Sequence, residues 1–363
     1  MTILQHTRNA GLGALAAALL TGSVFVAPAQ AVETIKMTAL DGYSDKAIWV
    51  ERFKNYFVPE VDKILAKSGK YKIEWNLALN GQIVKPRKVL GGLQKGLGDI
   101  GVVTHIFHPD KVPLYGISFN TPFSTVDPMV VTKTIDKLVA KFPAFKDGWK
   151  KYNQITLTNG ITLDTYQLFL KKPIKSMADL KGLKIMAGGD NKKFLKGWGA
   201  TPVGGSLMGY YDKVKTGIAD GAMIWPQAAG AFKFAEVTPY MLDLRIGSMA
   251  SKAINVNANT WKKLPQEVKD ALQTAAIGYR DQMAIHSVKK SKILFKKYLA
   301  AGGKVIAVSD ADRLKYAKAI GPIAKEWAAS LEKKGVPGKA ILAAYMGALR
   351  DAKQPILRDW DKE

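Results

Sequence analysis

The chain has 363 residues, and its 54 basic and 30 acidic side chains give a formal net charge of +24. It contains no cysteine, which excludes disulfide bonds, a thiol nucleophile and the modified cysteine of a lipoprotein anchor. The length corresponds to about two domains with ample cores. The lysines are scattered and form no aromatic-interleaved basic motif, so a nucleic-acid binder is disfavoured and a general polyanion-binding protein is kept as an alternative.

Residues 1–31 have the pattern of a signal peptide. Residues 11–27 are almost entirely apolar or small, and Pro28 and the small-x-small site Ala29-Gln30-Ala31 follow them. The apolar stretch is short for a membrane span, and an uncleaved anchor helix is the alternative. No other run reaches the roughly 18 apolar residues that a span needs. We therefore expect a soluble periplasmic protein that is not a lipoprotein.

The first part of the mature chain alternates between strand and helix patterns. The expected elements are a strand at 33–40, an amphipathic helix at 46–68, a strand at 71–79, a helix at 85–95 and a buried strand at 100–103. Asn80-Gly81 predicts a turn after the second strand. This order predicts a mostly parallel sheet covered by helices.

The same alternation returns further along the chain. It predicts strands at 183–186, 201–204 and 222–225, and helices at 191–198 and 210–216. Two segments are also alike, LQKGLGDIGVV at 93–103 and VKTGIADGAMI at 214–224. Each reads as a helix end, a glycine cap, an aspartate and a strand. The chain is therefore expected to form two α/β lobes of related design.

A long helix is expected from about 264 to 301. At 1.5 Å per residue it reaches about 55 Å, which is long enough to brace both lobes. Further helices are expected at 311–334 and 338–352. No flexible linker is present in the sequence, so strands that cross between the lobes are expected to join them.

Motifs for enzyme chemistry are weak. The glycines of GLGDIG at 96–101 match the spacing of a dinucleotide loop, but a helix precedes them and a strand follows, which favours a helix cap. His105 and His108 lie near Asp110 without the regular spacing of a metal site. No Walker loop, G-x-S-x-G elbow or H-E-x-x-H motif occurs. We expect no catalytic residue, no metal and no cofactor.

Several motifs resemble those of the substrate-binding subunits of TRAP (tripartite ATP-independent periplasmic) transporters. The resemblance covers the mature chain and depends on Asn80-Gly81-Gln82 before LQKGLGDIGVV, FNTPF at 119–123, PIKSMADLKGLKI at 173–185, the helix before Asp220-Gly221, and Pro322 to Ala328. The segment at 173–185 is the most specific of these matches.

This resemblance implies an α/β fold, a two-lobe periplasmic binding protein of type II-like design with mixed sheets, hinge strands and a long bracing helix. Residues 32–160 with about 247–300 would form one lobe, and 161–246 with about 301–363 the other. We expect a monomeric receptor without a nucleic-acid partner. A small organic acid would be captured between the lobes by hinge closure and delivered to the TRAP membrane permease.

The sequence departs from the family pattern at three ligand positions. Met186 stands where the family usually has an arginine that grips a carboxylate. Tyr166 falls on a second family arginine, and Trp225 on an asparagine. These changes replace polar or cationic groups with apolar or aromatic surface. From these departures we expect a ligand with an apolar or aromatic body, such as an aromatic carboxylate.

A carboxylate would still need a donor, and Arg245 is the candidate, unless it pairs with Asp243 or another surface acid. Met186 has core packing as its alternative. The candidate ligand-binding residues are Met186, Trp225, Arg245, Tyr166, Thr104, His105, Gln82 and Tyr43. The alternative functions are a receptor for a small aliphatic mono- or dicarboxylate and an exported enzyme on a similar scaffold.

Overall fold

The computed structural model describes residues 31–363. The predicted signal peptide therefore lies outside the described residues, except for Ala31. No helix in the described part of the chain is both long and apolar enough to cross a membrane.

The described strands form one sheet of nine strands in the order β2-β1-β3-β8-β4-β7-β5-β6, and β9 pairs with β8 outside this path. The strands are β1 (Glu33–Leu40), β2 (Tyr71–Ala78), β3 (Ile100–Val103), β4 (Gln154–Leu170), β5 (Lys184–Met186), β6 (Thr201–Val203), β7 (Gly221–Ile224), β8 (Tyr240–Asn257) and β9 (Lys304–Ile306). Six of them, β1–β3 and β5–β7, lie within one residue of the predicted bounds. Strands β4, β8 and β9 were not located from the sequence, and β4 and β8 are much longer than the others.

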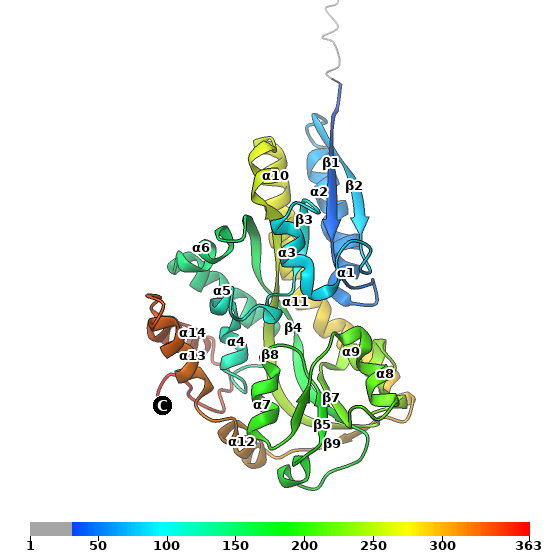
Figure 1. The fold of residues 1–363 in the computed structure, drawn as a ribbon, viewed down its shortest axis with the longest axis vertical. Coiled ribbons are helices and arrows are strands. Elements are labelled where there is room, and N and C mark those ends of the chain that lie inside the picture. The colour runs from blue at the N-terminus through cyan, green and yellow to red at the C-terminus, as the bar shows by residue number, and fades with distance from the viewer. Residues whose placement is uncertain (1–30) are drawn as a thin grey trace, which may run out of the picture. The chain divides into compact units, whose positions relative to one another are not determined.

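Strands β4 and β8 run antiparallel through the middle of the sheet (Figure 1). At one end β8 pairs with β3, which pairs with β1, and β1 pairs with β2. At the other end β4 pairs with β7, which is followed by β5 and β6, while β9 pairs with β8. We call β1–β3 the first half-sheet and β5–β7 with β9 the second half-sheet. The two long strands are the covalent connections between them.

Register shifts interrupt the β4–β8 ladder between its two ends. Gly160 in β4 has a φ of 70° and Gly247 in β8 has a φ of 135°, values that residues with a Cβ rarely adopt. Such irregular pairing bends a strand and weakens its ladder locally. The middle of the two long strands is therefore less regular than their ends.

Two similar segments, one in each half-sheet, lead from the end of a helix into a parallel strand in the same way. Gly96 and Gly217 end the preceding helices with φ values of 72° and 81°. Asp99 then accepts a hydrogen bond from the Thr38 backbone N–H at 2.8 Å, and Asp220 accepts one from the Lys184 backbone N–H at the same distance. The predicted likeness of the two segments is thus a likeness of structure, and the glycines of GLGDIG cap a helix.

Helices cover the sheet. They are α1 (Ile48–Arg52), α2 (Val58–Leu65), α3 (Val89–Gln94), α4 (Ile117–Asn120), α5 (Pro128–Lys141), α6 (Ala144–Lys150), α7 (Asn191–Gly197), α8 (Tyr210–Lys215), α9 (Pro226–Ala231), α10 (Ala258–Lys263), α11 (Gln266–Ala300), α12 (Asp310–Ala319), α13 (Ile323–Glu332) and α14 (Gly338–Asp351). A π-helical segment, Phe53–Phe57, joins α1 to α2, so the helix expected at 46–68 is one continuous but irregular element.

The 35-residue helix α11 packs against α2 and α5 and also against α9, and thereby braces both half-sheets as expected. Two buried tyrosines attach it. The Tyr279 hydroxyl donates to the Trp49 carbonyl at 2.7 Å on the side of the first half-sheet. The Tyr298 hydroxyl donates to the Thr238 carbonyl at 2.8 Å on the side of the second.

The helix expected at 311–334 is divided into α12 and α13, because Gly321 with a φ of 81° and Pro322 separate them. Helix α14 packs on α13 and α5, and the Leu357 backbone N–H donates to the Phe123 carbonyl. The C-terminal helices thus contact elements assigned by the sequence to the other lobe. The exact lobe boundaries remain a prediction.

Candidate functional site

A cavity lies where parallel strands of both half-sheets end. Tyr43 follows β1, Thr104 follows β3, Gly188 and Gly205 follow β5 and β6, and Trp225 directly follows β7. In open α/β sheets, ligands bind outside the carboxyl ends of the strands, where loops from several strands converge. The topology therefore brings short loops from five strands to this one place.

Aromatic rings from both half-sheets form the wall of this cavity. Trp49 on α1 meets Tyr43 edge-on, with ring centroids 4.8 Å apart, and lies 6.3 Å from Trp225. Tyr166 on β4 meets Trp225 edge-on at 5.5 Å. The Trp225 indole N–H donates to Gln227 Oε1 at 2.9 Å, which fixes the orientation of its ring. Such a wall favours flat or apolar groups.

The cavity volume is about 40 Å³. A pocket for a small organic ligand usually measures about 300 Å³ or more, so a solute enters only if the surrounding loops separate. Arg87 spans the mouth: its guanidinium lies 4.3 Å above the Phe107 ring, and its Nη2 donates to the Gly205 carbonyl at 3.5 Å. This exposed arginine lies between β2 and β3 of the first half-sheet and thus contacts the loop that follows β6 in the second half-sheet.

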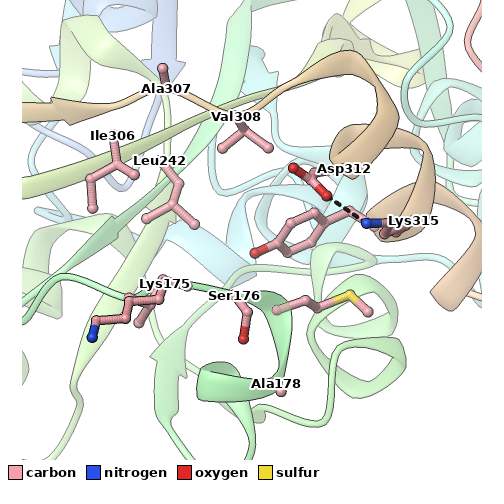
Figure 2. Close-up of a pocket in the computed structure, with 12 residues that line it drawn as sticks. Lys175, Ser176, Ala178, Leu242, Ile306, Ala307, Val308, Asp312 and Lys315 are labelled. Atoms are coloured by element: carbon pink, nitrogen blue, oxygen red, sulfur yellow. Dashed lines mark hydrogen bonds and ion pairs between the residues drawn. The ribbon is translucent and has the colours of Figure 1, made fainter.

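A larger cavity of about 290 Å³ lies elsewhere, between the segment Ile174–Ala178, β9 and the start of α12. Figure 2 shows Asp312 and Lys315 paired at its edge, and the two groups are 2.8 Å apart. Both are well exposed to solvent. Among the described residues that line this cavity none is a buried charged residue, so its size alone does not make it the better candidate for a specific polar ligand.

Lys252 is the charged residue among those that line the cavity between the half-sheets. It lies on β8 opposite Ile161 of β4, and only 3 % of its surface is exposed. Its Nζ donates to Ser251 Oγ at 2.9 Å and sits 3.9 Å from the centroid of the Trp49 ring, in cation–π geometry. Burial lowers the pKa of Lys252 to about 7, although the nearby Asp41 carboxylate opposes this shift.

Asp41, which follows β1, is a second buried ionisable group beside the cavity. Burial raises its pKa to about 7, while the Tyr43 backbone N–H and the charge of Lys252 act in the opposite direction. That N–H donates to Asp41 Oδ1 at 2.8 Å. Burial and the positive charge of Lys252 lower the pKa of His105, which keeps its imidazole neutral.

Some buried polar atoms around the cavity have no hydrogen-bond partner among residues 31–363. They include the Trp49 indole N–H and the Asn191 side-chain oxygen, which line the cavity, and Asp41 Oδ2 and His105 Nε2 beside it. Unpaired buried polar groups are costly and cluster at functional sites. The cavity therefore offers both donors and acceptors to a small polar ligand.

Four of the predicted site residues, Trp225, Tyr166, Thr104 and Tyr43, line the cavity together. His105 is buried next to Thr104, with its ring against Tyr115. Met186 is fully buried, and its Cε lies 3.1 Å from the position that a Cβ on Gly205 would take. It supports the floor of the cavity from below, in agreement with the packing alternative.

The other two predicted residues lie away from the cavity. Gln82 is exposed in the turn after β2. Arg245 pairs with Asp310 at 3.0 Å and with Asp243 at 3.6 Å near the surface, which is the alternative considered for it from the sequence. The structure thus offers Lys252, and not Arg245, to an anion in the cavity.

Sequence reasoning missed Lys252, Asp41 and Trp49. A signal for Lys252 was available, because it is the only charged residue between Arg245 and Lys262, in a run that otherwise reads as buried strand. Nothing comparable distinguished Asp41 or Trp49. No cluster of three or more potential metal ligands occurs in the described part of the chain. Burial lowers the pKa of His108, one of the two histidines considered from the sequence, to about 4.

Comparison with known proteins agrees with this architecture. Residues 48–331 match the family model of the bacterial extracellular solute-binding proteins, family 7 (DctP). The fold is similar to that of a TRAP solute-binding protein of Rhodoferax ferrireducens in complex with copurified benzoate (TM-score 0.77, 17 % identity, 88 % of this chain and 98 % of that chain covered).

Two further structures are similar at 20 % identity. One is a marine metagenome TRAP solute-binding protein specific for aromatic acid ligands, with a TM-score of 0.76 and coverage of 88 % of this chain and 98 % of that chain. The other is an extracytoplasmic solute receptor of Bordetella pertussis that binds pyroglutamic acid, with a TM-score of 0.73 and coverage of 86 % and 99 %. At this level of identity the likeness shows the two-lobe fold.

Proposed function

Since the chain belongs to the family 7 bacterial extracellular solute-binding proteins, which serve TRAP transporters and are receptors and not enzymes, we propose that it captures an organic acid with an apolar or aromatic body. The observation that carries this proposal is the wall of Tyr43, Trp49, Tyr166 and Trp225 around a buried cation. The exported protein, freed of its signal peptide, delivers the acid to the permease from the periplasm.

Capture proceeds by closure. Tyr43 and Trp49 lie between β1 and β2 of the first half-sheet, and Trp225 follows β7 of the second. A ligand between them contacts residues of both halves and therefore favours the closed form. The irregular middle of β4 and β8, with Gly160 and Gly247, supplies the hinge. The weak Arg87–Gly205 contact at the mouth breaks when the halves separate.

The structures described above include receptors found with benzoate, with an aromatic acid and with pyroglutamic acid. The ring-lined wall favours the first two ligand types over an aliphatic diacid, because flat rings pack against tryptophan and tyrosine. A small aliphatic mono- or dicarboxylate is the competing ligand class.

A thermal-shift panel tests the proposal. Benzoate, 3-hydroxybenzoate, pyroglutamate, succinate and the neutral benzamide are added to the mature protein. We expect the aromatic acids to raise the melting temperature by mass action and to be recovered unchanged, with calorimetry giving the affinity. Tight binding of succinate without binding of aromatic acids would refute the proposed ligand class, and recovery of a converted product would refute the receptor role.

A further inference from the structure

Lys252 is a buried cation whose counter-ion the described residues do not fully supply. An ammonium group carries three N–H donors, and the hydrogen bond found for Lys252 within residues 31–363 uses one of them, to Ser251 Oγ. The face of Trp49 lies against the ammonium group, and the Asp41 carboxyl is close enough to influence its pKa. Burying a charge without a partner is expensive, so such a lysine in a cavity wall is suited to pair with an incoming anion.

Asp41 is a poor counter-ion for this lysine. One of its oxygens already accepts from the Tyr43 backbone, and no ion pair between Asp41 and Lys252 forms in the described structure. Burial raises the pKa of Asp41 and lowers the pKa of Lys252, each to about 7, so neither charge is complete at neutral pH, and a bound anion would favour the charged form of Lys252. A ligand carboxylate, which ionises well below pH 7, supplies the missing charge.

We propose that Lys252 holds the carboxylate of the captured solute, while the body of the solute lies against Trp49, Trp225 and Tyr166. This inference rests on the proposed function and names the group that recognises the acid. The Trp49 indole N–H is directed toward Asp41 and helps to hold down the pKa of that carboxyl, so the ligand carboxylate is assigned to Lys252. One buried cation in the lining matches one negative charge, so the ligand class is a monocarboxylate.

Affinity for such a ligand should depend on pH. Lys252 loses its proton as the pH rises through about 7, and Asp41 becomes negative over the same range. Both changes weaken the attraction for an anion. The other titratable side chains with shifted pKa values that face the site keep their charge over this range, because the pKa of His105 is lowered and the pKa values of Tyr43, Tyr166 and Tyr210 are raised.

Calorimetry with benzoate between pH 6 and pH 9 checks this expectation. We expect the affinity to fall by roughly tenfold for each pH unit above the pKa of Lys252. Asp41→Asn should reduce the fall, because one of the two charges that change is removed. A flat profile for the unaltered protein would contradict the assignment of Lys252.

The direct test compares Lys252→Met with three other variants, using benzoate and benzamide as probes. Lys252→Met should weaken benzoate binding roughly 30-fold, leave benzamide binding unchanged and not lower the melting temperature, since it removes a poorly paired buried charge. Lys252→Arg should restore part of the benzoate affinity. Lys289→Met, on the exposed face of α11, controls for the loss of one positive charge, and Arg245→Gln tests the candidate derived from the sequence.

The outcomes separate the two proposals. If the unaltered protein binds benzoate and Lys252→Met binds it equally well, the role of Lys252 is refuted and the receptor function stands. The role of Lys252 is also refuted, and the receptor function stands, if Arg245→Gln loses affinity for benzoate while Lys252→Met does not. If the unaltered protein binds no carboxylate, the proposed function fails and the role of Lys252 fails with it.

Discussion

Replacing Trp225 with alanine is expected to weaken the binding of an aromatic acid at least 100-fold, or about 3 kcal/mol. The side chain is 5 % exposed and contacts Tyr166 on β4 and Trp49 from the first half-sheet. Its removal takes away the ring that the second half-sheet offers to the ligand, so the ligand no longer holds the two halves together. Titration calorimetry with benzoate measures the loss.

Two controls accompany Trp225→Ala. Trp225→Phe keeps a flat ring and loses the hydrogen bond to Gln227, so most of the affinity should remain. Trp198→Ala removes an equally buried tryptophan, which donates to the Tyr316 carbonyl outside the cavity lining. It should lower the melting temperature but not the affinity. Equal losses of affinity in Trp225→Ala and Trp198→Ala would mean that Trp225 acts only through stability.

Replacing Gly230 with alanine is expected to lower the free energy of unfolding by about 3 kcal/mol. Gly230 lies in α9 where it crosses α11, and a Cβ there would lie 2.1 Å from the Leu294 carbonyl oxygen and 2.6 Å from its carbonyl carbon. Both are backbone atoms in a long helix and cannot move aside cheaply. Helix α9 must therefore shift, and because it begins directly after Trp225, the ligand affinity should fall as well.

Gly347 supplies the matched control for this change. It lies inside α14, and a Cβ there would meet nothing within 4 Å. Gly347→Ala should stabilise the protein by about 0.5–1 kcal/mol, because alanine favours the helix. Chemical denaturation of both variants measures the difference. Equal stability of Gly230→Ala and Gly347→Ala would show that α9 and α11 are not in close contact.

Local elements were predictable because their patterns are short-range. Strand β1 lies at its predicted residues, and Gly96 adopts the left-handed conformation that a helix cap requires. The long helix α11 shows in the sequence because no proline interrupts it after Pro265. The long strands β4 and β8 were not located, since their bulges and glycines break the alternation that identifies a strand.

The residues of the candidate site also differ in whether a local pattern could identify them. Trp225 and Tyr166 are predicted from positions that align with ligand-binding residues of the family, and the structure places both in the cavity wall. Arg245 is predicted as a carboxylate donor from its alignment with a polar position of the family, but its partners Asp310 and Asp243 hold it near the surface. A guanidinium position depends on which acids the folded chain brings near it, and Asp310 is distant in sequence.

By itself the sequence determined the α/β class, the repeated strand–helix pattern, the bracing helix and the family, because each rests on local periodicity or on motifs of contiguous residues. Tertiary structure alone decided which residues surround the buried charge. A lysine usually reads as a solvated side chain, and Lys252 is different only because β8 carries it between Trp49 and Asp41, residues some 200 positions away in the chain. Long-range strand pairing sets that neighbourhood, and no local pattern encodes it.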